Sequence, residues 1–104
     1  MLLSTTDQIV GKKIVKQLGL AKGNTIRARH IGRDILAILR HIIGGEITDY
    51  TKMMAESREQ AIDRMTEDAK KMGANAVVRV SFSTQMIMGG ASEILAYGTA
   101  VLVE

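Results

Sequence analysis

The fold of this chain is decided by its closing run, Glu93-Ile94-Leu95-Ala96-Tyr97-Gly98-Thr99-Ala100-Val101-Leu102-Val103. Read as a strand, the run places Leu95, Tyr97, Val101 and Val103 on one face, and Ile94, Ala96, Ala100 and Leu102 on the other. A strand that is apolar on both faces must be covered on both. Helices can cover one face, and in a 104-residue chain the natural cover for the other is a neighbouring subunit. We therefore expect a final strand buried on both faces and a homo-oligomer.

The residues before this run predict a partner strand. Apolar and polar residues alternate there, with Val78, Val80 and Phe82 set between Arg79, Ser81 and Ser83. This period of two is typical of a strand with one wet face. The segment from Met86 to Ser92 contains Gly89-Gly90 and is expected to form the turn that joins the two strands into a hairpin.

Two helices are expected in the middle of the chain. Apolar residues from Ile31 to Ile43 recur at helical spacing, and Gly44-Gly45 would end this short helix. A longer helix is expected from Thr48 to Met72, with Gly73 as its C-cap. Its apolar stripe consists of Tyr50, Met54, Ala61, Met65, Ala69 and Met72.

The N-terminal part reads as strands. Leu2–Thr5 fits a short edge strand, and two further strands between Lys13 and Ala28 are expected to join near Lys22-Gly23-Asn24. The order of elements predicts an α+β fold, in which an antiparallel sheet packs with one short and one long helix. We expect a single domain over residues 1–104, because nothing in the chain resembles a linker.

Composition excludes several kinds of chemistry. The chain has no cysteine, so it offers neither disulfides nor thiolate ligands. No signal-peptide pattern or membrane-spanning run is present, and we expect a soluble, cytoplasmic protein.

The net charge is +3, and it is divided unevenly. Residues 1–45 hold eight basic and two acidic side chains, whereas residues 46–104 hold six basic and nine acidic ones. Such a division can steer an anionic partner or let the basic face of one subunit meet the acidic face of another, and it also fits two solvated surfaces.

A family resemblance rests on a few segments that together cover nearly the whole chain. They are Gly23-Asn24-Thr25-Ile26-Arg27-Ala28, Ile31-Gly32-Arg33-Asp34-Ile35-Leu36, Gly44-Gly45-Glu46, Gly73-Ala74-Asn75-Ala76-Val77 and the closing run. They resemble the YbjQ-like family, whose label names a heavy-metal-binding domain and which has no settled biochemical function. The resemblance implies an α+β subunit that assembles into ring-like pentamers, sometimes stacked as decamers. The number five rests on the resemblance alone.

Candidate site residues follow from those segments and from the family's label. The polar residues of the segments are candidates for ligand binding, namely Arg27, Arg33, Asp34, Glu46, Glu93 and Tyr97. Candidate metal ligands are His30, His41, Met86 and Met88. The two histidines would be about 16 Å apart along a helix and cannot share an ion within one subunit. Ser83 stands where the family pattern often has an acidic residue, which weakens the metal interpretation.

Motifs of known enzyme classes are absent from the sequence: it contains no nucleophile elbow, metalloprotease motif or phosphate-binding loop. We therefore expect no catalytic residues. Nucleic acid is not the expected partner either, because the basic cluster around Arg27 and Arg33 has no stacking aromatics nearby. We expect a homo-oligomeric protein that binds a small ligand, such as a small anion, or a metal ion of unknown identity. Two alternatives stay open, an enzyme with its active site between subunits and an interaction protein without a small ligand.

Overall fold

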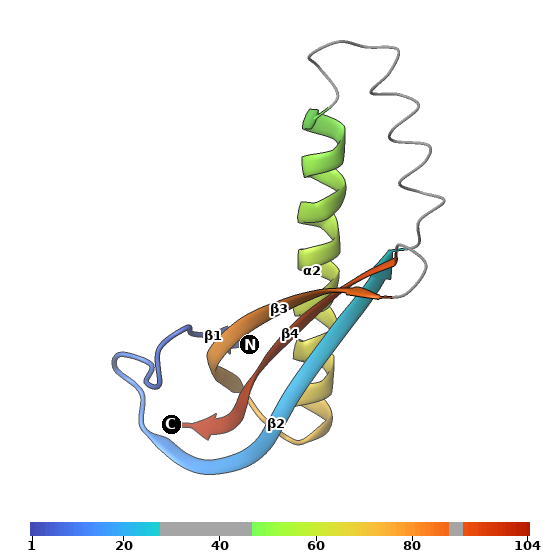
Figure 1. Cartoon of the computed structure of the whole chain (residues 1–104). Coiled ribbons are helices and arrows are strands. Elements are labelled where there is room, and N and C mark those ends of the chain that lie inside the picture. Colours follow the sequence, from blue (N-terminus) through green and yellow to red (C-terminus); the bar gives the residue numbers. More distant parts are fainter. Residues whose placement is uncertain (28–46, 88–90) are drawn as a thin grey trace.

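The computed structural model describes residues 1–27, 47–87 and 91–104, which form a mixed α+β fold (Figure 1). Strands β1 (Leu2–Leu3), β2 (Ile14–Arg27), β3 (Ala76–Ile87) and β4 (Ala91–Val103) form one sheet in the order β1-β3-β4-β2. The β1–β3 pair is parallel, and the other pairs are antiparallel. The described part holds one helix, α2 (Ile47–Lys71), rather than the two that we expected. The expected short helix, Ile31 to Ile43, lies outside the described residues.

Helix α2 confirms the expected long helix to within a residue at each end. Its inner stripe is buried, since Ala61, Met65 and Ala69 are fully inaccessible to solvent. Gly73 has a φ of +87° and ends the helix in a Schellman motif, in which Gly73 N–H donates to Lys70 C=O and Ala74 N–H to Ala69 C=O. Within the described residues, no helix is long and apolar enough to cross a membrane.

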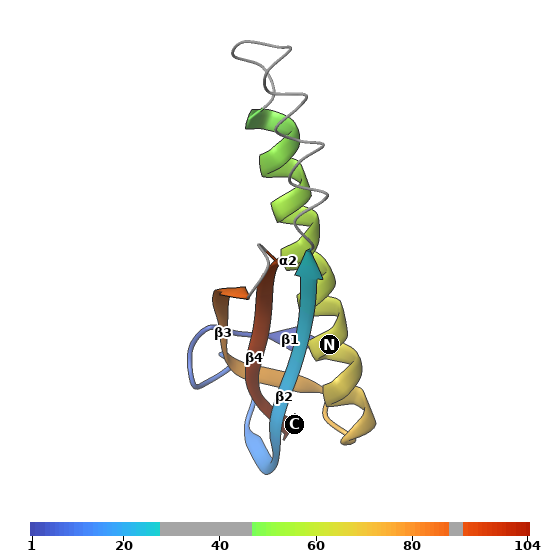
Figure 2. The ribbon, with the colours of Figure 1, turned by 45° about the vertical axis from the view of Figure 1, so that its right-hand side comes forward.

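Strand β2 corrects the expectation of two strands joined near Lys22-Gly23-Asn24, because it runs unbroken through these residues. Gly23 is needed for space and does not form a turn. A Cβ atom at this position would lie 2.2 Å from Met65 N and 2.5 Å from Ala61 O of α2. The backbones of β2 and α2 therefore touch here, and the helix lies over β2 and β4 and has little contact with β3 (Figure 2).

A bulge in β2 also changes which side chains share a face. The register with β4 shifts between Gln17 and Gly19, where Gly19 has a φ of +138°. Leu18 consequently packs into the core under α2, whereas Leu20 points to the other side of the sheet and is 59% exposed. Regular alternation would have placed these two leucines on one face, and the bulge puts them on opposite faces.

The β3–β4 hairpin confirms the expected pair of strands, with one irregularity at Arg79. The register shifts between Val78 and Ser81, and Arg79 takes a φ of +54°. Both Arg79 N–H and Val80 N–H donate outward, to Thr6 C=O and Ser4 C=O, each at 2.9 Å. The bulge therefore docks the N-terminal segment (residues 4–13) against the sheet.

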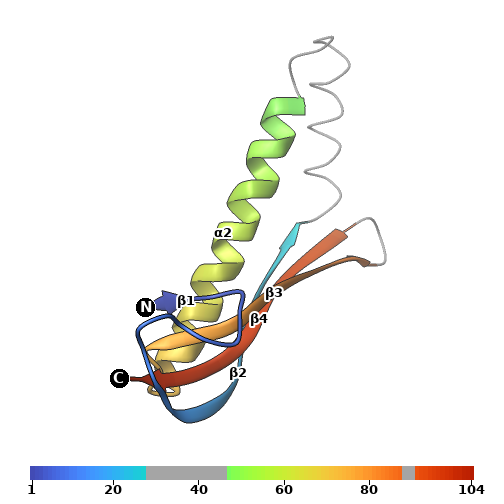
Figure 3. The same ribbon diagram turned by 90° about the vertical axis from the view of Figure 1, so that its left-hand side faces the viewer.

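Strand β4 is covered on both faces over part of its length. Ile94, Ala96 and Ala100 lie in the core beneath α2, as expected. Val101 and Val103 belong to a second cluster on the opposite face, where Ile9 of the N-terminal segment packs against them. Figure 3 shows this segment (blue) looping beside β3 and β4. For these two valines the cover comes from the same chain, which corrects the expectation that it would be a neighbouring subunit. Tyr97, farther along that face, is 37% exposed.

The contact at Gly23 predicts a large cost for a single methyl group. Replacing Gly23 by Ala should lower the free energy of unfolding by about 3 kcal/mol, because the obstructing atoms are helix backbone and cannot move aside locally. Chemical denaturation measures this change. Lys22→Ala, one residue away and exposed, is the matched control and should change stability by less than about 0.5 kcal/mol. Equal effects of the two substitutions would disprove the close contact.

At Arg79 the backbone conformation predicts that a substitution by glycine stabilises the protein, in contrast to the destabilisation expected when Gly23 is replaced. A left-handed conformation costs a residue with a Cβ about 1 kcal/mol, so Arg79→Gly should stabilise the protein by about that amount. The control is Arg58→Gly at an exposed position inside α2, which should destabilise by about 1 kcal/mol. Thermal unfolding of both variants tests the contrast in sign. Destabilisation by Arg79→Gly would mean that the arginine side chain contributes more than its backbone strain costs.

Candidate functional site

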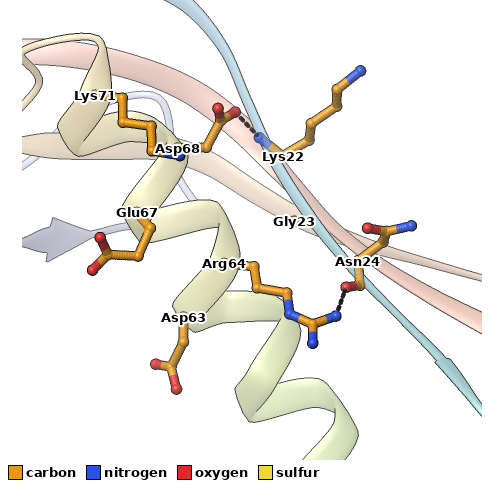
Figure 4. Close-up of a pocket in the computed structure, with 8 residues that line it drawn as sticks. All are labelled: Lys22, Gly23, Asn24, Asp63, Arg64, Glu67, Asp68 and Lys71. Carbon is orange, nitrogen blue, oxygen red and sulfur yellow. Dashed lines mark hydrogen bonds between the residues drawn. The ribbon is translucent and has the colours of Figure 1, made fainter.

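A pocket between β2 and α2 gathers many charged groups, and its volume is about 380 Å³ (Figure 4). Its lining consists of Lys22, Gly23, Asn24, Asp63, Arg64, Glu67, Asp68 and Lys71. Lys22 N–H donates to Asp68 Oδ2 at 3.0 Å, and the Arg64 guanidinium donates to Asn24 C=O. Because β2 is an edge strand, these side chains complete the hydrogen bonding of its outer backbone. The charges of this pocket thus hold the helix to the sheet edge.

The opposite side of the sheet carries a different set of polar residues, which we call the open face. It consists of Lys22, Asn24, Ser81, Ser83, Glu93, Leu95 and Tyr97, placed by the strand registers. Tyr97 on β4 is directly paired with Lys22 on β2 and with Ser81 on β3. The next row along the strands pairs Leu95 with Asn24 and Ser83. These side chains lie across the sheet from α2, and Figure 4 shows the Lys22 side chain extending away from the helix.

Hydrogen bonding on the open face is uneven. Asn24 Nδ2 donates to Glu93 Oε2 at 3.0 Å, which links neighbouring rows and holds the carboxylate in place. The Tyr97 ring is 37% exposed, and its hydroxyl has no hydrogen-bond partner within the described part of the chain. The Lys22 side chain is exposed, and its ammonium makes no ion pair with any described residue. The open face therefore offers two hydrogen-bond donors to which no described residue is bound.

Only some of the residues predicted from the sequence fall in the described structure. Glu93 and Tyr97 share the open face, where they lie four residues apart, about 13 Å along β4. Arg27 ends β2 opposite Ser92, and its side chain is outside the description. The remaining ligand candidates, Arg33, Asp34 and Glu46, lie outside the described residues, as do His30, His41 and Met88.

The sequence did not predict Lys22, Asn24 and Ser81 as site residues. They become neighbours of Tyr97 only through the registers of two separate strand pairs. The sequence did contain a signal for these residues, because polar residues recur there at a spacing of two, as Lys22 and Asn24 do on β2 and Ser81 and Ser83 do on β3. Turning that signal into a site requires knowing the bulges, because each bulge reverses the faces beyond it.

The part of the chain that the structure describes contains no set of residues that could bind a metal ion. No three His, Cys, Asp or Glu side chains there lie close enough to hold one ion. Met86 is 81% exposed on the side of β3 that faces α2, whereas Glu93 lies on the open face. These two candidates therefore cannot coordinate the same ion within one subunit. A metal site would need ligands from beyond the described residues or from a second subunit.

Comparison with known proteins agrees with the fold. The chain is similar to a UPF0145 protein of Methanosarcina acetivorans, with 60% identity over 103 residues that cover 99% of this chain and 97% of the relative. A UPF0145 protein of Pyrococcus furiosus is 55% identical and is matched over 100% of this chain and 91% of its own length. A crystal structure of a protein of unknown function from Pediococcus pentosaceus, of the DUF74 family, aligns with a TM-score of 0.65 at 13% identity, covering 100% of this chain and 98% of that one. That structure supports the fold alone.

The family assignment rests on a match over the full length. A family model described as "Putative heavy-metal-binding" matches residues 1–104. The resemblance noted in the sequence is thereby confirmed. The segments that carried it and that the structure describes contribute to β2, β3 and β4. This chain belongs to the YbjQ family, together with the UPF0145 proteins.

Proposed function

We propose that this protein is a homo-oligomeric binding module, in which identical subunits form a ring and hold a small ligand on the open face. The observation that carries the proposal is the state of the open face, where Tyr97 and Lys22 are accessible and the Tyr97 hydroxyl and the Lys22 ammonium have no partner among the described residues. A flat sheet face encloses a small ligand poorly, since ligand sites bury most of the ligand surface in a cleft. A neighbouring subunit placed over this face would supply the second wall.

Exposed apolar side chains on both sides of the sheet support an assembly. On the open side of β2, Leu20 is 59% and Ile26 is 56% exposed. On the α2 side of β3, Phe82 is 45% and Met86 is 81% exposed, because the helix lies over β2 and β4. Apolar side chains that gather on strand surfaces favour contact with another protein surface.

The positions of these two pairs favour a ring over a two-fold dimer. They lie on opposite sides of the sheet and on different strands, so one pair can meet the other pair of the next subunit. Such a head-to-tail contact repeats around a circle and closes into a ring when the rotation permits. The extended shape agrees, since the radius of gyration is 17.0 Å, whereas a compact chain of about 100 residues has about 13 Å. The family resemblance supplies the number five.

Binding of a metal ion, as the family description suggests, is the second candidate. The described residues hold no set of ligands for it, so the support for this candidate is the family description together with histidines outside the described structure. Native mass spectrometry of protein purified without chelator separates the two candidates. A bound metal adds the mass of an ion, whereas an organic ligand adds a larger mass that denaturation releases.

The head-to-tail arrangement predicts complementation between two variants. Leu20→Asp and Met86→Asp should each break the ring, because an unpaired carboxylate in an apolar contact costs about 3 kcal/mol and weakens association about 100-fold. Each variant retains one intact surface, so an equimolar mixture should form a dimer with one subunit of each kind. Light scattering and native mass spectrometry measure the masses.

The control for these two variants is Val10→Asp, since Val10 is 100% exposed and lies in the N-terminal segment, on neither of the two strands that carry the pairs. Val10→Asp should assemble like the parent protein. A monomeric parent protein would refute the proposed assembly. Mixed variants that stay monomeric while the parent assembles would refute the head-to-tail contact between these surfaces.

A further inference from the structure

One row of the open face consists of three hydrogen-bond donors side by side. Lys22, Tyr97 and Ser81 are directly opposite one another across β2, β4 and β3. The Cβ atoms of directly paired residues in antiparallel strands are about 5 Å apart, so neighbouring side chains of the row can reach a common group. The row contains an ammonium, a phenol and an aliphatic hydroxyl, and it contains no carboxylate.

Among the described residues, the nearest carboxylates are bound elsewhere and do not compensate the positive charge of the row. Asp68 accepts the backbone N–H of Lys22 from the α2 side of β2, at 3.0 Å. Glu93 accepts from Asn24, also at 3.0 Å, and lies four residues from Tyr97, or about 13 Å along β4. Among the described residues, the ion pair within 4.0 Å is Lys70–Glu67, on α2. The Lys22 ammonium is thus available to an outside anion.

We propose that the row Lys22–Tyr97–Ser81 recognises an oxyanion, the carboxylate or phosphate group of a small molecule. The Lys22 ammonium supplies the charge, and the hydroxyls of Tyr97 and Ser81 donate hydrogen bonds to the anion oxygens. The half-buried Leu95 and the exposed part of the Tyr97 ring form an apolar surface beside the row for the rest of the ligand. This inference rests on the proposed function of the open face and names the chemistry of its ligand.

The chemistry of the row also separates an anion from a metal ion. A cation would meet the positive charge of Lys22, and an ammonium has no lone pair with which to coordinate it. Ser81 Oγ has a long hydrogen bond of 3.4 Å to Arg79 C=O, which it can exchange for a stronger one to a charged oxygen. The row therefore favours oxyanions by charge and by hydrogen-bond polarity together.

Titration of the full-length protein with simple anions tests the inference. Inorganic phosphate and acetate are added separately at constant ionic strength, with acetamide as the neutral counterpart of acetate, and backbone amide chemical shifts are followed by NMR. We expect saturable shifts at Lys22, Ser81 and Tyr97 with at least one of the two anions and none with acetamide. A response to phosphate alone, to acetate alone or to both tells which oxyanion the row accepts, and each supports the inference.

Three variants assign the binding to the row. Lys22→Met keeps the apolar stem and removes the charge, and it should weaken binding at least tenfold. Tyr97→Phe removes one donor and should weaken binding severalfold. Lys16→Met on the same strand, about 20 Å from the row, is the matched control and should leave binding unchanged. Circular dichroism of each variant verifies that the substitution leaves the protein folded.

Two results would overturn the inference: no saturable shift at the row with either anion, or equal affinity in the parent protein and Lys22→Met. The oligomeric state and any copurified ligand are measured on the same samples by native mass spectrometry. An assembled protein that carries a ligand but fails to bind either anion retains the proposed function and loses this inference. A monomeric protein without ligand loses the proposed function, whatever the anion titration shows.

Discussion

The absence of a side chain at Gly23 is the constraint on which the rest of the structure depends. Because a Cβ there would lie 2.2 Å from Met65 N, the helix and the edge strand can approach until their backbones touch. The surrounding core accordingly consists of small side chains, such as Ala21, Ala61 and Ala96, all fully buried. The largest fully buried apolar side chains in the described structure are Met65, Val77 and Val101. Such a core buries little apolar area per residue, which leaves larger side chains at the surface.

The features that could be predicted from the sequence are those that depend on local physics. The long helix follows from its apolar stripe and from the cap at Gly73, and the hairpin follows from alternation and the Gly89-Gly90 turn signal. Gly23 shows the limit of this approach. A glycine can be required for a positive φ or for space, and the sequence does not distinguish these reasons. Gly23 was interpreted as a turn, whereas its neighbours in space come from a helix nearly 40 positions away.

The candidate site was only half predictable for a related reason. Glu93 and Tyr97 belong to one strand, so the period of two places them on one face without further knowledge. Lys22 and Ser81 reach Tyr97 through two strand registers, and a bulge lies near each of them, at Gln17–Gly19 in β2 and at Val78–Ser81 in β3. A bulge inserts a residue and reverses the faces beyond it, which simple alternation does not reveal. The neighbourhood of Tyr97 therefore emerges only from the folded sheet.

The two faces of β4 are packed differently: one lies in the core beneath α2, and the other is covered only in part. The face beneath α2 carries Ala96 and Ala100 in the core beside Ile94, and the close contact at Gly23 leaves little space near Ala96 for a larger side chain. The opposite face is restricted only where Ile9 covers Val101 and Val103. Beyond that cover, Tyr97 and its neighbours Lys22 and Ser81 contribute little to the core. Packing in the core therefore does not determine which residue types stand at these positions. A lysine without an ion pair and a tyrosine hydroxyl without a partner, side by side among the described residues, make the recognition of an oxygen anion the demand that best matches their chemistry.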